Sequence, residues 1–404
     1  MNPRIDEARF RLLSVYHDAV ARVSGRRLVA NHLDHNPFAS HCHVLAIGKA
    51  AVAMCHGVLD SGMAVQSGLV VYPDQQCPAA IAPSIECHAA QHPLPGPGSF
   101  AAGERALEFL AGLPDAAPLL ALLSGGGSSL MEAPWEGVSE QDVAAVHDWL
   151  LSSGLDIVDV NRIRQSLSRV KGGGLARHMG ARPCRVLALS DVPPGYPSAL
   201  ASGPFLPALG GELPIVPDWI SVLLGKEAPP DTPEIDHVVV ADSGTLAAVA
   251  AELGGVFHLP VHAGHGWVEG DAADMGRSLA QTLRDAEPGF WVWTGETTIT
   301  LPSVPGRGGR CQQLALAAAE CLAGQDDCLL LACGSDGLDG PEGDAGAIVD
   351  GETLERGRAA GLCAEDALDW ADAGRFLAAA GDLVNTGPSD TNVNDLIIGV
   401  KLPR

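Results

Sequence analysis

Short apolar runs alternate along this chain with longer segments in which apolar residues recur at helical spacing. The clearest run is Leu119 to Leu123, and a similar run, Val44 to Ile47, precedes it. Short apolar strands separated by helices are typical of parallel sheets that are covered on both faces. We therefore predict an α/β fold with strands at 44–48, 68–72, 84–89, 119–123, 185–190, 237–241, 256–260, 290–294, 297–301, 328–333 and 395–400.

The segments outside these runs predict helices. The predicted helices are 5–29, 99–112, 140–153, 243–253, 269–285, 309–323 and 372–380. Residues 206–236 interrupt the alternation because they contain six prolines, and this predicts a connector. We therefore expect an N-terminal α/β domain (1–235) and a C-terminal one (236–404). The pattern leaves open which domain the N-terminal helix packs on.

A glycine-rich loop, Ser124 to Ser129, follows the strand predicted at 119–123. Its three consecutive glycines have no side chains to pack, and ordering them costs entropy. They are expected where backbone N–H groups closely approach a ligand. Such a loop between a strand and a helix commonly binds an anion, usually phosphate. A flexible surface turn is the alternative.

Lysine is rare in this chain, and two of its four lysines lie beside glycine in motif-like loops. Lys49 follows a predicted strand and opens a segment of small residues with helical character. A compact ammonium group suits phosphate charge at such a turn better than a planar guanidinium. Lys171 ends a cationic segment that begins at Asn161, and three glycines follow it. For both lysines an ordinary surface position is the alternative.

Further polar groups follow predicted strands, where open α/β sheets place their ligands. Asp191 can bind Mg²⁺ or accept a hydroxyl proton, or it can simply start a turn. Arg310 combines a guanidinium with a predicted helix N-terminus, which suits a carboxylate or a transferring phosphoryl group. Asp336 and Asp339 are Mg²⁺ candidates within an acidic turn, and His92 is a weaker candidate base. Two domains that both present such loops predict a site in the cleft between them.

Composition narrows the possible functions. The net charge is −24, from 25 basic and 49 acidic residues, which argues against non-specific binding to nucleic acid or anionic membranes. The N-terminus shows no signal-peptide pattern and no apolar run has membrane-spanning length, so we expect a cytoplasmic protein. The ten cysteines include no CxxC pair, and this indicates neither a zinc site nor a disulfide framework. The absence of a Walker A motif and of a GxGxxG after the first strand weakens both a P-loop ATPase and a dinucleotide enzyme.

Taken in order, these motifs resemble the glycerate 2-kinases whose C-terminal half is the MOFRL domain. The matching strings are Gly48 to Ala50, Ser124 to Ser128, Asn161 to Gly173, Ser190 to Pro193, Ala201 to Pro204, Gly295 to Thr298, Gly308 to Gln312, Asp336 to Pro341 and Thr391 to Asp395. The resemblance implies two α/β domains, the first Rossmann-like with a mostly parallel sheet. It also implies ATP-dependent phosphorylation of D-glycerate at its 2-hydroxyl, giving 2-phosphoglycerate, with Mg²⁺ or another divalent cation.

On this resemblance the expected catalytic residues are Lys49, Arg310 and Asp191. The expected nucleotide- and phosphate-binding residues are Ser124, Gly125, Gly126, Gly127, Ser128, Ser129, Asn161, Lys171, Glu296, Asn392 and Asn394. Asp191 and Asp336 are the expected metal ligands. The chain departs from the usual family pattern at Tyr196, Cys311, Gln313 and Asp390, which leaves the acceptor specificity open.

Two other functions compete with a kinase. One is an NAD(P)H-dependent hydroxypyruvate reductase, a label that some members of this family have carried, but the missing dinucleotide motif argues against it. The other is a non-catalytic protein that binds a nucleotide or a sugar acid. The sequence does not determine the oligomeric state, for which a homodimer is one option.

Overall fold

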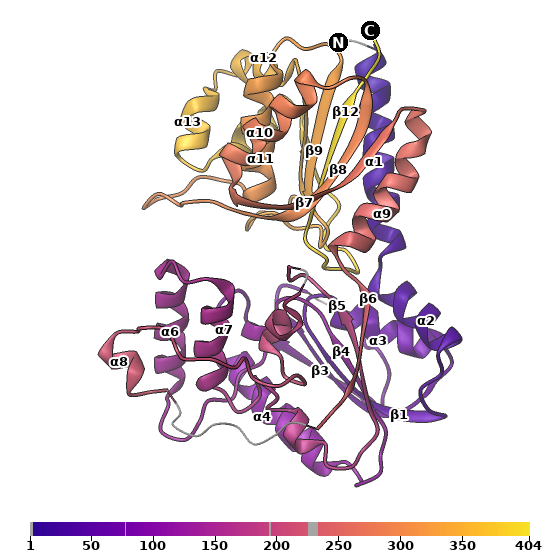
Figure 1. Ribbon diagram of the computed structural model, residues 1–404, viewed down its shortest axis with the longest axis vertical. Coiled ribbons are helices and arrows are strands. Elements are labelled where there is room, and N and C mark those ends of the chain that lie inside the picture. The colour runs from indigo at the N-terminus through magenta and orange to yellow at the C-terminus, as the bar shows by residue number, and fades with distance from the viewer. Residues whose placement is uncertain (1–2, 77, 194, 225–232) are drawn as a thin grey trace. The chain divides into compact units, whose positions relative to one another are not determined.

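The computed structural model describes residues 3–76, 78–193, 195–224 and 233–404. The chain forms two compact units, which Figure 1 shows as ribbons. The N-terminal unit is Gly25–Val240, and the C-terminal unit combines Met1–Ser24 with Ala241–Arg404. Each unit contains one six-stranded sheet with helices packed against it.

The sheet of the N-terminal unit has the strand order β3-β2-β1-β4-β5-β6. Its strands are β1 (His41–Ile47), β2 (Ala64–Pro73), β3 (Ile85–Ala90), β4 (Leu119–Leu123), β5 (Cys184–Leu189) and β6 (Asp236–Ala241). The pairings that connect β3, β2, β1, β4 and β5 are all parallel, as predicted. The chain moves outward in one direction from β1 to β2 and in the other direction from β1 to β4, so the strand order reverses between β1 and β4. In open α/β sheets this point is where ligands bind.

The helices of the N-terminal unit cover this sheet and form a second small core. They are α2 (Gly25–His35), α3 (Ala51–Asp60), α4 (Pro97–Gly112), α5 (Gly127–Leu130), α6 (Glu140–Ser152), α7 (Ile157–Ser166) and α8 (Asp218–Ser221), with 3₁₀ helices η1 (Ala176–His178) and η2 (Pro197–Ser202). The main core lies between the sheet and helices such as α4. Val146, Ile163 and Ile220 join α6, α7 and α8 in the second core. Residues 225–232 of the predicted connector lie outside the described residues.

The sheet of the C-terminal unit is mixed, with the order β11-β10-β9-β12-β8-β7. Its strands are β7 (Val261–Asp271), β8 (Gly289–Thr298), β9 (Cys328–Gly334), β10 (Gly346–Asp350), β11 (Leu383–Val384) and β12 (Asp395–Lys401). Among the described residues, β7 and β8 pair in parallel, whereas the other neighbouring strands of this sheet pair antiparallel. The prediction of a parallel sheet is therefore wrong for this unit. Its apolar strands are buried on both faces, and such a run looks the same in either direction.

From Ala241 onward the C-terminal unit also contains six α-helices and one 3₁₀ helix among the described residues, and its strands differ from the predicted ones in three respects. The helices are α9 (Ser243–Leu253), α10 (Ala272–Asp285), α11 (Arg310–Leu322), α12 (Thr353–Ala359), α13 (Ala364–Asp369) and α14 (Ala373–Ala380), with the 3₁₀ helix η3 (Gly254–Phe257). The strands predicted at 290–294 and 297–301 are one strand, β8. The strand predicted at 256–260 is instead the end of η3 and a short connection, and β7 begins only after it, at Val261. Strands β10 and β11 are not predicted by the sequence.

The N-terminal helix and the boundary near 236 both need correction. A single helix over 5–29 is wrong, because α1 (Pro3–Arg22) ends before α2 begins at Gly25. The two helices bury their apolar faces in different units, so the chain has to break between them. The predicted C-terminal domain starts at 236, but β6 is instead the edge strand of the N-terminal sheet. There the Arg185 Nε donates to Asp236 Oδ2 at 2.7 Å, which fixes β6 beside β5.

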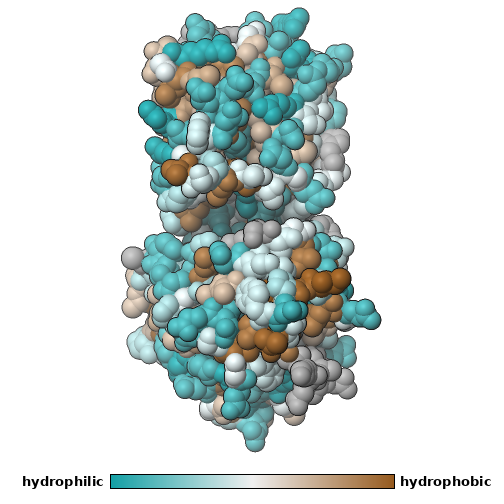
Figure 2. Space-filling view, turned by 90° about the vertical axis from the view of Figure 1, so that its left-hand side faces the viewer, coloured by the Kyte–Doolittle hydropathy of each residue, from teal (hydrophilic) through white to brown (hydrophobic). Residues whose placement is uncertain are grey.

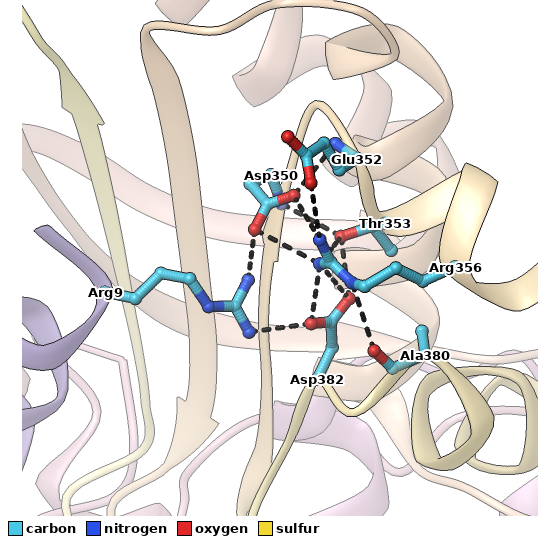
Figure 3. Close-up of polar contacts among 7 residues, drawn as sticks. All are labelled: Arg9, Asp350, Glu352, Thr353, Arg356, Ala380 and Asp382. Atoms are coloured by element: carbon cyan, nitrogen blue, oxygen red, sulfur yellow. Dashed lines mark hydrogen bonds and ion pairs between the residues drawn. The ribbon is translucent and has the colours of Figure 1, made fainter. Parts of the chain in front are cut away.

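Helix α1 is attached to the C-terminal unit by a buried ion network, shown in Figure 3. Arg9 forms ion pairs with Asp350 and, at 2.6 Å, with Asp382. Arg356 bridges the same two carboxylates, at 3.0 Å from Asp350 and 2.8 Å from Asp382. Further along α1, the buried Tyr16 hydroxyl donates to the Gly334 carbonyl at 2.8 Å. These contacts answer the question that the sequence pattern left open.

We expect Arg9→Met to destabilise the C-terminal unit by about 2 to 4 kcal/mol, because two buried carboxylates would then share a single cation. Arg11→Met is the matched control on the same helix. Its ion pair with Glu7 is solvent-exposed, so we expect a loss below about 0.5 kcal/mol. Urea denaturation of both variants measures the difference. Equal midpoints for the two variants would show that the network contributes no more than a surface pair.

The surface is mainly polar. Figure 2 shows one face on which hydrophilic residues predominate and apolar residues occur in small groups. Within the residues that the structure describes, none of the helices combines the length and the apolar character needed to cross a bilayer.

Candidate functional site

Two loops meet at the point where the strand order of the N-terminal sheet reverses. One follows β1 and contains Gly48 and Lys49, and the other follows β4 and begins at Ser124. The Ser124 N–H donates to the Ile47 carbonyl at 3.0 Å, and the Lys49 N–H donates to the Gly125 carbonyl at 2.9 Å. The two loops are therefore held together by backbone hydrogen bonds at the carboxyl ends of adjacent parallel strands.

Glycine is required at three positions of these loops. Gly48 has φ +127°, and a Cβ atom there would lie 2.2 Å from Ser124 Oγ. Gly126 has φ +82°, in the left-handed region that other residues rarely adopt. A Cβ on Gly127 would lie 2.7 Å from the Cβ of Ala201. The loops are thus packed backbone against backbone, which is not expected of a flexible surface turn.

The three serine hydroxyls of the glycine-rich loop make contacts within the protein. Ser124 Oγ accepts the Ala50 N–H at 3.0 Å, and Ser129 Oγ donates to the Gly126 carbonyl at 3.2 Å. Ser128 Oγ lies 2.8 Å from the hydroxyl of Ser202. These contacts hold the loop in shape, and the loop backbone adds N–H groups that can bind a ligand. Among the described residues, no group accepts a hydrogen bond from the N–H of Gly125.

The side chains of Lys49 and His92 lie against this loop. A Cβ on Gly126 would be 3.2 Å from Lys49 Cγ and 3.1 Å from His92 Cδ2. The backbone of Lys49 is fixed on both sides, because its carbonyl also accepts the Gln76 Nε2 at 2.9 Å. Lys49 therefore stands where the sequence predicted it, next to the glycine-rich loop. From the sequence alone His92 is only a weak candidate, because a single histidine in a loop is a weak signal.

Asn161 is connected to the loop through Ser202. The Ser202 hydroxyl donates to Asn161 Oδ1 at 2.7 Å, and Asn161 Nδ2 donates to the Ile157 carbonyl at 2.9 Å. Ala201 and Ser202 both have positive φ, at 50° and 58°, a strained conformation for residues with a side chain. Asn161 thus supports Ser202, which contacts Ser128. The structure therefore shows an indirect connection of Asn161 with the loop, and a direct contact with a nucleotide stays a prediction.

Lys171 is buried and paired with a carboxylate of the protein. Its Nζ forms an ion pair with Glu132, and the two side chains are 0% and 1% exposed. Burial lowers the pKa of Lys171, although Glu132 opposes this shift. The structure thus shows Lys171 in a buried ion pair, and its role in phosphate binding stays a prediction. The sequence could not reveal this, because Glu132 is distant along the chain.

We expect Glu132→Gln to destabilise the N-terminal unit by about 3 to 5 kcal/mol, because it leaves the Lys171 ammonium buried without its partner. The double variant Glu132→Gln/Lys171→Met removes both charges and should regain most of this loss. Glu104→Gln, which breaks a surface pair with Arg169, is the control and should cost less than about 1 kcal/mol. Urea midpoints measure all three. A double variant no more stable than Glu132→Gln would contradict the pairing.

Asp191 lies two residues after the end of β5, at the same edge of the sheet as the two loops. It is half-buried, whereas Tyr196, a few residues later, is exposed. Its position suits a role at this edge of the sheet.

In the C-terminal unit, Arg310 holds two carboxylates. It is the first residue of α11, and its Nη1 lies 2.5 Å from Glu296 while its Nη2 lies 3.3 Å from Asp395. Asp395 begins β12 and pairs in register with Gly295 of β8 and Gly334 of β9. Burial raises the pKa of Asp395, Glu296 and Asp336 add to this, and Arg310 opposes it. Asp395 is a site residue that the sequence reasoning missed.

The N-terminus of α11 is occupied by a carboxylate of the protein itself. Asp339 accepts the N–H groups of Cys311 at 2.9 Å and Gln312 at 2.8 Å. Burial and the nearby Asp395 raise the pKa of Asp339 to about 7. These two N–H groups at the start of α11 are therefore satisfied within the protein, and a role of Arg310 in anion binding stays a prediction. Asp339 is a helix cap here and no longer a metal candidate.

Two of the four departures from the family pattern face the protein core. Cys311 is buried, and Gln313 Nε2 donates to the Leu368 carbonyl at 2.9 Å, which ties α11 to α13. These substitutions alter packing behind Arg310 and leave its polar neighbours in place. Asp390 is exposed and, with Tyr16, lines a cavity of about 440 Å³.

The remaining predicted residues precede β12. Asn392 and Asn394 are both buried, and the turn that carries them is fixed where Ser335 Oγ accepts the Val393 N–H at 2.8 Å. Asp336 is half-buried, and its Oδ1 accepts the Leu338 N–H at 3.0 Å. Among the described residues there is no group of three or more His, Cys, Asp or Glu side chains arranged to hold a metal ion.

Comparisons with known proteins agree with this arrangement. A family described as a domain of unknown function (DUF4147) matches residues 11–210, and the MOFRL family matches residues 289–395. A protein of Agrobacterium vitis, whose name gives hydroxypyruvate reductase as a provisional activity, is 35% identical over 96% of this chain and 93% of its own. The D-glycerate 2-kinase of Thermotoga maritima is 32% identical over 88% of this chain and 90% of its own.

The fold is also shared with a solved structure. The crystal structure of glycerate kinase from Thermotoga maritima matches with a TM-score of 0.84 and 29% identity, covering 98% of this chain and 100% of that chain. The similarity therefore extends over both units.

Proposed function

This chain belongs to the glycerate 2-kinase family that carries a C-terminal MOFRL domain, and from that premise we propose that it is a glycerate kinase. The proposed reaction transfers the γ-phosphoryl group of ATP to the 2-hydroxyl of D-glycerate and gives 2-phosphoglycerate and ADP. The proposal rests on the two loops that backbone hydrogen bonds join where the strand order reverses. The side chain of Lys49 lies against the glycine-rich loop there. Phosphoryl transfer needs such positioning and charge neutralisation more than covalent chemistry.

Each residue has a role in this proposal that follows from its chemistry. The loop backbone at Gly125 and Gly126 binds phosphate oxygens, and Lys49 neutralises charge on the transferring group. Arg310 is the cation that the C-terminal unit offers for charge neutralisation. Asp191 accepts the proton of the 2-hydroxyl or helps to hold the metal. Asn161 acts indirectly, by fixing Ser202 and the loop.

ATP and Mg²⁺ fit the side chains available. Mg²⁺ usually binds one or two carboxylates together with phosphates and water, so a protein site of three ligands is not needed. Asp191 in the N-terminal unit and Asp336 in the C-terminal unit are each proposed as a candidate carboxylate for it, and the ion would neutralise phosphate charge. Glu296, Asn392 and Asn394 are proposed nucleotide contacts. Because ATP is a metabolite of the cytoplasm, we place the reaction there.

The test is ADP release with ATP, Mg²⁺ and D-glycerate, followed through a coupled assay and by identification of the phosphorylated product. Omission of the acceptor is the first control, because it measures ATP hydrolysis alone. Glycerate-dependent ADP release with 2-phosphoglycerate as product is the expected result. Product phosphorylated at the 3-hydroxyl would overturn the position of transfer, and no acceptor-dependent release would overturn the kinase.

A reductase is the second candidate, supported by the name of one relative. The loop after β1 runs Gly48-Lys49-Ala50-Ala51 and lacks the glycine pattern that brings a dinucleotide pyrophosphate close to the backbone. Loss of NADH absorbance with hydroxypyruvate would favour the reductase. ATP binding without turnover on either substrate would favour the non-catalytic alternative.

A further inference from the structure

A group of four ionisable side chains in the N-terminal unit contains two cations but only one carboxylate. It consists of Glu132, Lys171, Arg164 and His147, from the segments around α5, α6 and α7. Lys171 is paired with Glu132. His147 adds no charge, because burial and the two neighbouring cations lower its pKa to about 2. The charge of Arg164 is therefore the one without a counterpart.

Arg164 makes no hydrogen bond or ion pair with any described residue. Its Nε is buried and has no partner, while the residue as a whole is only partly buried. Burial lowers the pKa of Arg164, and Glu132 is close enough to oppose this shift but does not form an ion pair with Arg164. A desolvated guanidinium with no partner costs stability, and such a cost is usually kept where a ligand supplies the missing anion.

The position of Arg164 connects it with the glycine-rich loop. It lies three residues after Asn161 on α7, so the two side chains share one helix face about 5 Å apart along the axis. Asn161 is hydrogen-bonded to Ser202, which in turn contacts Ser128. Glu132 lies two residues after α5, the short helix that begins in the same loop. The unbalanced cation thus stands next to the supports of the proposed phosphate loop.

We propose that Arg164 binds the carboxylate of the acceptor hydroxy acid and so determines its selection, an inference that rests on the proposed kinase function. The planar guanidinium matches a carboxylate with two parallel hydrogen bonds. In the proposed kinase, the loop backbone and Lys49 already bind the phosphate groups of ATP, so Arg164 is available for the carboxylate of the acceptor. Binding the acid removes the charge imbalance, and uncharged polyols cannot do this.

The test compares Arg164→Met and Arg164→Lys with Arg162→Met. Arg162 is the matched control, because it lies on the same helix but holds Asp159 at 2.5 Å and the Gly210 carbonyl at 3.0 Å. We expect Arg164→Met to raise the KM for D-glycerate about 100-fold, the order expected for loss of a charged bidentate contact. The KM for ATP should stay within about twofold. Arg164→Lys should recover only part of the loss.

Thermal unfolding without ligand separates this role from a structural one. A ligand-binding cation predicts that Arg164→Met melts at the wild-type temperature or above, whereas a structural arginine predicts a lower melting temperature. Calorimetric titration with D-glycerate and with glycerol, each with and without a non-hydrolysable ATP analogue, gives a readout that needs no turnover. Wild type should bind only the acid, and Arg164→Met should bind neither.

Several results would overturn the inference. Unchanged D-glycerate affinity in Arg164→Met, or an equal rise in the KM for ATP, would remove the carboxylate assignment while leaving the kinase intact. If wild type releases no ADP with D-glycerate, the kinase proposal fails, and the titrations alone judge Arg164. Wild type that binds no D-glycerate in any titration would overturn the inference as well.

Discussion

Lys49→Met should lower kcat by about 10³-fold while leaving the protein folded, since removal of one preorganised charge contact to a transition state has effects of this order. Methionine keeps the length of the side chain that lies against Gly126, so packing should survive. The backbone bonds of Lys49 to Gly125 and Gln76 do not involve the side chain and also remain. Only the ammonium group is lost.

The control for this variant is Lys401→Met. Lys401 ends β12, and its ammonium group contacts the carbonyl of Arg284 at the surface, so we expect activity within about twofold of wild type. Lys49→Arg should fail to restore activity, because the wider guanidinium would have to fit between the loop and His92. Steady-state kinetics and circular dichroism test the three variants. If kcat in Lys49→Met stays within tenfold of wild type, Lys49 does not act on the transferring group.

The strands of the N-terminal sheet could be predicted from the sequence because apolar runs and the glycine-rich loops after them indicate the same strand ends. Strand β4 is an unbroken apolar run that ends in three glycines, and the observed strand has the predicted bounds. The C-terminal sheet was less accessible. Strand β10 joins β9 as an antiparallel neighbour without an intervening helix, so the strand–helix rhythm gives no signal for it. Its sequence, Gly346 to Asp350, also has only three apolar residues in a row, between a glycine and an aspartate, whereas all five residues of β4 are apolar.

The candidate site shows the same limit at the level of side chains. The sequence identified Lys49 and the glycine-rich loop because strand, glycine and cation are adjacent along the chain. It assigned Lys171 to the ligand for the same reason, although Glu132, far away in sequence, binds that charge. The neighbours of Arg310 were partly missed as well, since Asp395 reaches it only through strand pairing. Local patterns reveal loops, whereas the partners of charged groups depend on the fold.

Arg310→Lys is the second prediction with a large effect, and we expect kcat to fall by about 10² to 10³-fold. The guanidinium uses two nitrogens to hold Glu296 and Asp395 at once. One ammonium group keeps the charge but cannot span both carboxylates and still face a ligand. The control is Arg307→Lys, because Arg307 is similarly exposed, at 40% against 39% for Arg310, and pairs with Asp344. Unchanged kcat and KM in Arg310→Lys would show that the fork geometry has no role.

Arg310→Met adds a test of the electrostatics behind this site. Arg310 opposes the rise in the pKa of Asp395 that burial produces, so its removal should raise that pKa further. Above this pKa the folded protein then holds a buried carboxylate without its cation, and below it the carboxyl group is neutral. The stability lost in Arg310→Met should therefore be largest at alkaline pH and shrink as the pH falls through the pKa of Asp395. Urea midpoints of both proteins measured across pH check this, and a deficit that grows on acidification would mean that Arg310 does not compensate Asp395.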